Sequence, residues 1–373
     1  MTKPRRIILF SLFGLVLCPV TASANAGTPL MWAAMLHLVF GNAVIGAWEG
    51  FVLSRLFKLP FTRTAGVLVL ANYFSAWVGY YAMVTLAPST LPELFGGQPL
   101  YQASVVLWTV GFSSYLASVV LELPFCWYCL PKGERSCGKT VLVCLAAQTI
   151  SYGLLVPFYL AASPISLVSK TEHDASLSFA RTEKAWVYFI APDGGDIFRI
   201  RPDGSNRQFV LAAGITNRFH RLILLPATGE PAWNLCLVTE RGRLSEGSVS
   251  KILLERFTKK TRAARIPDFV ENSHFSFGEP IDYRTTSETT WKIWLGYWAA
   301  EGLHARSSSG DERRSFAFEA PFVMNWYARN ATVLPSGLVI YQLGEQIVAL
   351  DVEHRKVGFV TLGRGPVVVL EED

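Results

Sequence analysis

The sequence predicts a membrane protein in two parts, an α-helical four-helix transmembrane bundle followed by an all-β, small β-propeller-like extracytoplasmic domain. In the first part, long apolar runs are flanked by basic residues that occur in only two short clusters. The runs are about 23 to 25 residues long, enough to cross a bilayer. In the second part, residues 164–373, short alternating strands with turn signals replace the apolar runs.

The first 26 residues have the pattern of a secretory signal peptide. Lys3, Arg5 and Arg6 form a positive start, and Ile7 to Val20 form an apolar stretch that is short for a membrane span. We therefore expect a signal peptide at residues 1–26, a transmembrane domain at residues 27–163, and the β-rich domain after it.

The basic clusters predict the orientation of the bundle. They consist of Arg55, Lys58 and Arg63, and of Lys132, Arg135 and Lys139. The expected spans cover residues 30–54, 65–87, 101–124 and 140–163. Because basic residues beside a span stay on the cytoplasmic side, both clusters face the cytoplasm and the C-terminal domain is extracytoplasmic. We therefore expect a protein of the bacterial inner (cytoplasmic) membrane, with the lipid bilayer as its first partner.

The net charge of +5 does not indicate nucleic-acid binding. The excess of basic residues lies in the membrane half, where it reflects topology, and no basic patch is concentrated in the β-rich half.

Each expected span carries small or polar residues at helical spacing. The four stripes are Asn42, Gly46, Glu49 and Gly50; Asn72, Ser75, Ala76 and Gly79; Gly111, Ser114, Tyr115, Ser118 and Glu122; and Gln148, Ser151 and Tyr152. Small residues allow helix backbones to approach closely in lipid, and amides or hydroxyls bridge between helices. We expect these stripes to face the interior of the bundle.

Five polar residues in the spans are the candidate site: Asn42, Glu49, Asn72, Glu122 and Gln148. A carboxylate at membrane depth is costly, so Glu49 and Glu122 suggest a proton or cation site open to the cytoplasm. In the alternative interpretation, which the sequence alone favours, both carboxylates reach water or pair with basic residues of the loops. Those basic residues are Arg55, Lys58 and Lys139.

Two patterns in the cytoplasmic loop resemble functional motifs. Gly133 to Thr140 matches the phosphate-loop pattern GxxxxGK[ST], but such a loop must connect a strand to a helix of an α/β sheet. Here a transmembrane span precedes it, so we do not expect nucleotide binding. Cys126, Cys129 and Cys137 suggest zinc or redox chemistry. A structural zinc site needs four ligands, however, and the loop has no histidine to add to these three thiols, so reduced interfacial cysteines are the preferred interpretation. We expect neither a metal site nor a cofactor.

The β-rich half begins with a recognisable hairpin. Strands are expected from Trp186 to Ile190, from Asp196 to Ile200 and from Gln208 to Leu211, with Asp-Gly turns between them. A weak repeat follows, with units that begin near Ile197, Ile252, Leu303 and Ile347. Repeats of this length with several strands each are typical of propeller blades. Pro366 to Leu370 is expected to pair with an early strand and close the ring.

The segment from Tyr188 to Asp203 also resembles blades of the TolB and NHL type, in which an Asp-Gly turn is followed by an aliphatic residue, an arginine and another aliphatic residue. The resemblance covers about 25 residues and implies a β-propeller fold. It carries no catalytic residues with it. An irregular β-sandwich is the alternative fold.

The sequence contains no recognisable catalytic motif, so an enzyme is not the favoured interpretation. Asp193, Asp196 and Asp203 are interpreted as turn residues and not as calcium ligands. The preferred function is a membrane-anchored binding or scaffold protein whose outer β-domain recognises a peptide, glycan or partner protein of the cell envelope. The alternative is a small transporter or channel component that uses the intramembrane carboxylates.

Overall fold

The computed structural model describes eight stretches of the chain: residues 28–96, 100–217, 220–228, 232–239, 249–258, 290–296, 301–319 and 326–371. The expected signal peptide, residues 1–26, lies outside them. The chain divides into two compact units. The helical unit comprises residues 1–93, 104–164 and 319–323, and the β unit comprises residues 94–103, 165–318 and 324–373.

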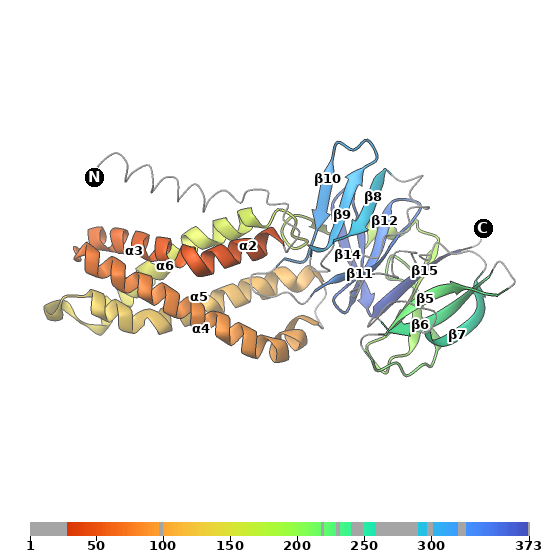
Figure 1. Cartoon of the computed structure of the whole chain (residues 1–373), viewed down its shortest axis with the longest axis horizontal. Helices are drawn as coiled ribbons and strands as arrows, with labels where there is room; N and C mark the ends of the chain where they lie inside the picture. The colour runs from red at the N-terminus through yellow and green to blue at the C-terminus, as the bar shows by residue number, and fades with distance from the viewer. Residues whose placement is uncertain are drawn as a thin grey trace. The chain divides into compact units, whose positions relative to one another are not determined.

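The helical segments cover the four stretches that were expected to be helical, and several extend beyond them (Figure 1). They are α2 (Pro29–Leu36), the π-helix η1 (His37–Gly41) and α3 (Asn42–Leu56), which follow one another directly, then α4 (Phe61–Gly96), α5 (Ala103–Cys129) and α6 (Cys137–Ala162). Three helices of the described chain are long and apolar enough to cross a membrane, at Pro29–Leu56, Leu100–Cys129 and Cys137–Ala162. They indicate a membrane-associated protein.

Local sequence explains where these helices begin. Thr28 caps α2, since its side chain accepts a hydrogen bond from the Met31 amide, and Pro29 follows in the first turn. Ser136 caps α6 by accepting a hydrogen bond from the Lys139 amide. The helix α5 continues through Pro124 to Cys129, five residues beyond the expected end of the third span at residue 124.

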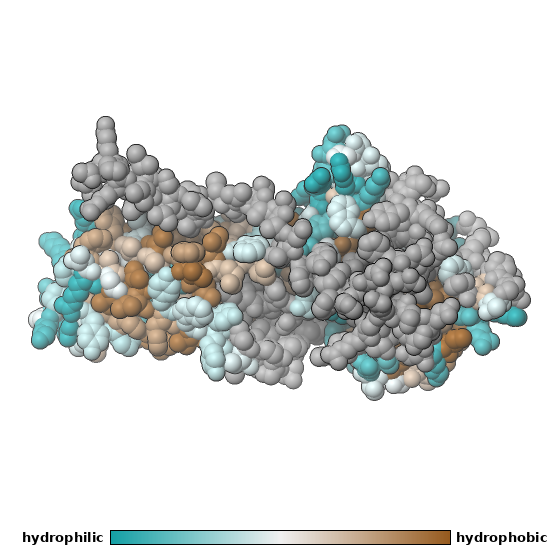
Figure 2. All heavy atoms as spheres, viewed as in Figure 1, coloured by the Kyte–Doolittle hydropathy of each residue, from teal (hydrophilic) through white to brown (hydrophobic). Residues whose placement is uncertain are grey.

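Apolar side chains lie on both the inside and the outside of the helical unit, and Figure 2 shows hydrophobic residues gathered over its helices. One inner cluster joins Leu53, Leu68, Leu130 and Val143, none of which is exposed. Outward-facing apolar residues, such as Val105 on α5, remain highly exposed. An apolar exterior of this kind matches a lipid environment better than water.

The β unit consists of four small sheets. The first contains β15 (Arg364–Leu370), β2 (Ala185–Ile190), β3 (Ile197–Ile200) and β4 (Gln208–Leu211). The second contains β5 (His220–Pro226), β6 (Trp233–Thr239) and β7 (Val249–Thr258), and the third contains β10 (Arg313–Phe316), β9 (Leu303–Ser307) and β8 (Trp291–Leu295). The fourth contains β1 (Glu172–His173), β14 (Lys356–Leu362), β13 (Gln346–Asp351), β12 (Leu338–Leu343) and β11 (Ala328–Val333).

The expected repeat follows this division into sheets. Its four starting residues, Ile197, Ile252, Leu303 and Ile347, each fall in a different sheet, on β3, β7, β9 and β13. The first and fourth units also share a register, because Phe198 pairs with Phe209 as Val348 pairs with Phe359. The described strands do not, however, close into a propeller or a barrel, so the coarser description of several small sheets holds.

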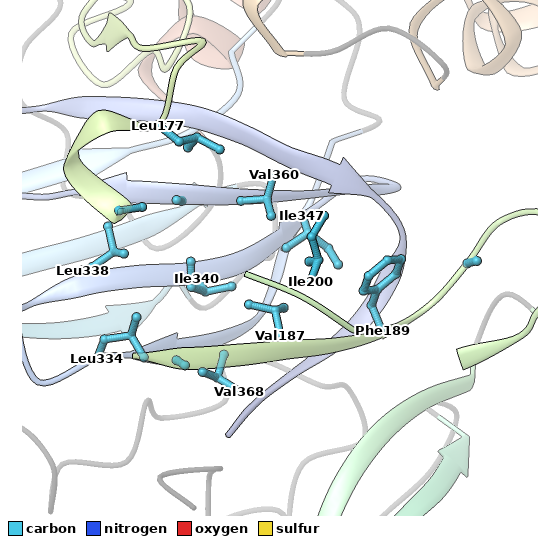
Figure 3. Packing of buried hydrophobic residues seen from close by; sticks show 14 residues of the cluster. Leu177, Val187, Phe189, Ile200, Leu334, Leu338, Ile340, Ile347, Val360 and Val368 are labelled. Atoms are coloured by element: carbon cyan, nitrogen blue, oxygen red, sulfur yellow. The ribbon is translucent and has the colours of Figure 1, made fainter. Parts of the chain in front are cut away.

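The C-terminal strand completes the first sheet, as expected. β15 pairs antiparallel with β2, with Val368 opposite Val187. Figure 3 shows one core beside this sheet, where Val187, Phe189 and Val368 meet Ile340 and Ile347 of the fourth sheet. Its opposite face packs on the second sheet through a separate hydrophobic cluster. The strand order therefore depends on contacts between residues that lie far apart in the sequence, such as Val187 and Val368.

Candidate functional site

Two glycines bring α3 and α4 into close contact. A Cβ atom added at Gly46 would lie 2.6 Å from the Val69 backbone, and one at Gly50 would lie 2.4 Å from the Ala65 Cα atom. Any larger residue would collide with the facing helix. The GxxxG pair on the first span therefore acts as expected, and it places the polar face of α3 directly against α4.

Glu49 of α3 is completely buried in the helical unit. Its Oε2 atom accepts a hydrogen bond of 2.6 Å from Asn72 Nδ2 of α4. Its Oε1 atom accepts a hydrogen bond from the Ser151 hydroxyl group of α6. Both carboxyl oxygens of Glu49 therefore have a donor, and the two donors come from two different helices.

Glu122 of α5 is also buried, with 1% of its surface exposed. Its Oε1 atom accepts a hydrogen bond of 2.6 Å from the Ser75 hydroxyl group of α4. Gln148 of α6 faces the same carboxyl group. However, Glu122 Oε2 and Gln148 Nε2 are both buried without a hydrogen-bond partner. The environment of Glu122 thus repeats that of Glu49, but with one donor fewer.

The site is therefore built from four helices, α3, α4, α5 and α6. α3 and α5 each provide one carboxyl group, and the two carboxyl groups interact electrostatically. α4 provides Asn72 and Ser75, and α6 provides Gln148 and Ser151. A spacing of three residues puts each of these pairs on one helix face. We call these six residues the carboxylate-pair site.

Neutral groups surround this site. Among the described residues, the hydrogen bonds to both carboxyl groups come from hydroxyl and amide groups. In the described part of the chain, Glu49 and Glu122 are 0% and 1% exposed, and the hydrogen bonds to them come from side chains other than Arg55, Lys58 and Lys139. Lys139, in the first turn of α6, pairs with Glu134 of the preceding loop, and Arg55 lies over the Phe51 ring.

Asn42 is the one candidate residue that the structure does not bring to the carboxylate-pair site. It is buried, and its Nδ2 atom donates to the Leu38 carbonyl of its own helix at 3.2 Å. Nearby, His37 Nδ1 and the Tyr159 hydroxyl group lie 2.5 Å apart. His37 is therefore packed against Tyr159.

Ser75 and Ser151 were not among the five candidate residues, although both donate to a carboxyl oxygen. The signal that identifies them is the three-residue spacing to Asn72 and to Gln148. A serine is common in transmembrane helices and is conspicuous only when it shares a face with an amide that meets a carboxylate.

The loop between α5 and α6 has a simpler structure than its two motifs suggest. α5 and not a strand precedes the segment from Gly133 to Thr140, and Ser136 occupies the cap of the following helix. Cys126, Cys129 and Cys144 are buried, whereas Cys137 is exposed. The described residues contain no group of three or more His, Cys, Asp or Glu side chains suited to hold a metal ion.

Aspartates of the β unit take the role of turn residues. Asp203 Oδ1 accepts hydrogen bonds from the Ser205 amide and hydroxyl groups, at 3.0 and 2.6 Å. Asp196 Oδ1 accepts one of 3.0 Å from the Ala213 amide. These contacts fix loops and explain the aspartates without a bound cation.

Comparison with known proteins gives no family to which the chain can be assigned. No protein-family model matches it, and no curated protein matches it significantly. Its function must therefore be inferred from the geometry of its own residues.

Proposed function

We propose that the protein is a small transporter or channel component, whose helical unit binds and releases a proton or small cation at the carboxylate-pair site. The observation that carries this proposal is that Glu49 and Glu122 are both buried and are surrounded by hydroxyl and amide groups of α4 and α6.

The energetic reason is the cost of burying charge. An ionised carboxylate in an apolar interior is unfavourable unless it is paired with a cation or is neutralised, and two neighbouring carboxylates increase that cost. Two apolar side chains would pack the bundle without this penalty. Buried ionisable groups in membrane helices are accordingly associated with ion and proton pathways.

We further propose that the bundle spans the bacterial inner membrane, with both basic clusters in the cytoplasm and the β unit outside it. The distribution of Lys and Arg along the chain supports this orientation. A reporter that is active only in the cytosol, fused to Asp373, tests it. We expect no signal from that fusion, and a strong signal would contradict the orientation.

The second candidate function is recognition of a peptide, glycan or partner protein of the cell envelope by the β unit, as a small propeller-like binding domain. The repeated sheets support it, as does an aromatic and basic surface on the first sheet. There, Arg199 and Arg201 lie 4.3 and 4.1 Å from the Trp186 ring. Pull-down of envelope components with the full-length protein tests this candidate. Loss of a captured component in Trp186→Ala would support it, and capture unchanged by that substitution would count against this surface.

Flux measurements test the transport proposal directly. The full-length protein is reconstituted in vesicles that contain a pH-sensitive dye, and ion gradients of either sign are applied. We expect Glu49→Gln and Glu122→Gln each to reduce flux by at least about tenfold, because each removes an ionisable group from the site while preserving its shape.

Two matched substitutions control this experiment. Glu134→Gln removes a carboxyl group that is paired with Lys139 in the loop, and Thr149→Ala removes an exposed hydroxyl group of α6 that bonds to its own helix. Both should retain wild-type flux. Equal flux in the wild type and in both glutamate variants, all folded, would contradict the proposal.

A further inference from the structure

We propose that the ion exchanged at the carboxylate-pair site is a proton, and that it binds at Glu122 Oε2. This inference rests on the proposed function and specifies its ligand. The site can take a proton or a metal cation in principle, and its hydrogen bonds distinguish the two.

The first step is the orientation of the polar groups. Asn72 Nδ2, Ser75 Oγ and Ser151 Oγ all donate hydrogen bonds to carboxyl oxygens. A metal ion is coordinated by oxygen lone pairs, whereas the Asn72 side chain directs its N–H group and not its oxygen at the Glu49 carboxyl group. The Asn72 amide is also held by a second hydrogen bond of 3.0 Å to the Leu68 carbonyl, so it cannot turn without losing two bonds.

The second step is the difference between the two carboxyl groups. Glu49 has a donor at each oxygen, and hydrogen bonds of this kind stabilise the ionised form. Glu122 has a donor only at Oε1, and its Oε2 atom is buried and unpartnered. A buried oxygen that accepts no hydrogen bond is costly in an apolar interior, so protonation at Glu122 Oε2 lowers the free energy more than protonation at an oxygen that already has a donor.

The third step is the group opposite this oxygen. Gln148 faces the Glu122 carboxyl group, and its Nε2 atom is also unpartnered. An amide group has a donor and an acceptor end. Rotation of the Gln148 amide would therefore present its oxygen to a protonated Glu122, or its N–H group to an ionised one.

Other titratable groups lie close to this pair. From α3, Glu49 faces Glu122; from α6, Tyr152 interacts with it; and on its own helix, Cys126 does so. From α4, the facing groups that bond to the two carboxyl groups are Ser75 and Asn72, which do not titrate. None of these neighbours supplies a positive charge, so neutralisation by a proton leaves one negative charge for the pair.

Dicyclohexylcarbodiimide, an apolar reagent, tests the proposal. A protonated carboxyl group adds across its C=N bond: the proton goes to nitrogen, the carboxyl oxygen bonds to carbon, and rearrangement gives a stable N-acylurea without any oxidant. The full-length protein in detergent is treated at several pH values, with and without sodium chloride, and the modified residue is identified by mass spectrometry.

We expect modification of Glu122 that increases as the pH falls, that is unchanged by sodium ions, and that persists in Glu49→Gln. Glu122→Gln should lose modification by at least about tenfold, because Glu134 in the polar loop is a poor target for an apolar reagent. Monodispersity of each variant on gel filtration confirms that it is folded.

The alternative outcomes separate the two proposals. If sodium ions protect Glu122 from modification, the ligand is not a proton alone, but an ion-binding function remains. Preferential modification of Glu49 would overturn the assignment to Glu122. If neither glutamate reacts at any pH and both Gln variants retain wild-type flux, the proposed function itself fails.

Discussion

Asn72 of α4 donates one hydrogen bond to the Glu49 carboxyl group of α3 and a second to the Leu68 carbonyl of its own helix. The Asn72 amide group thus links the buried Glu49 carboxyl group to the backbone of α4 through two hydrogen bonds. This contact fixes both the rotation of α4 and the orientation of the Glu49 side chain.

Asn72→Leu should therefore destabilise the helical unit. The substitution keeps a similar volume but leaves Glu49 Oε2 without its donor, which costs roughly 1–3 kcal/mol. Asn42→Leu is the matched control, because the Asn42 amide group donates to the Leu38 carbonyl and also interacts with His37, but it donates to no carboxyl group among the described residues. The free energy of unfolding of each variant is measured in detergent. An equal loss of stability in Asn72→Leu and Asn42→Leu would contradict this role of Asn72.

The sequence predicted the members of the site better than their arrangement. Helical spacing placed Glu49 and Asn72, and Glu122 and Gln148, on inward-facing stripes, and the structure brings these residues together. Asn42 does not reach the carboxylate-pair site, because it precedes Glu49 by seven residues, or about 10 Å along a helix, too far to share a partner. Spacing within one helix gives a face, whereas contact also requires the relative depth of neighbouring helices.

The glycines on α3 provide a second prediction. Gly46→Ala and Gly50→Ala each introduce a Cβ atom within 2.6 Å of facing α4 atoms, so each should cost about 1–3 kcal/mol through overpacking. Gly79→Ala and Gly111→Ala are matched controls, since an added Cβ atom there meets nothing within 4 Å. Thermal unfolding in detergent distinguishes them. If Gly79→Ala and Gly111→Ala lower the thermal stability as much as the α3 substitutions do, the close approach of α3 and α4 does not explain the role of Gly46 and Gly50.

The same contrast shows why not every small-residue stripe was informative. Gly79 and Gly111 lie on predicted stripes but face open space.

In the β unit, local patterns predicted the structure correctly: the Asp-Gly turns predicted β3 and β4, and Gly194 and Gly204 adopt the positive φ angles that such turns need. Whether the sheets form a ring depends on long-range contacts that no local pattern contains.

A third prediction concerns Glu319, which belongs to the helical unit although it follows β10 in the chain. Glu319 Oε1 accepts a hydrogen bond of 3.3 Å from the Leu30 amide in the first turn of α2, and its Oε2 atom accepts one of 2.7 Å from the Ser163 hydroxyl group. Burial raises the pKa of the Glu319 carboxyl group, and these hydrogen bonds oppose that shift only in part.

A carboxyl group with a raised pKa in the folded protein makes stability depend on pH in a definite direction. Between the ordinary pKa and the raised one, the folded state holds the proton while the unfolded state has released it, so stability falls as the pH rises through this window. Glu319→Gln removes this dependence and retains an oxygen that can accept the Leu30 hydrogen bond. Relative to the wild type, the variant should therefore gain stability with increasing pH, as measured by unfolding from about pH 4 to about pH 8. Glu134→Gln, at an exposed carboxyl group in the loop, should show no such trend. A constant difference between Glu319→Gln and the wild type at every pH would show that Glu319 does not titrate in this window.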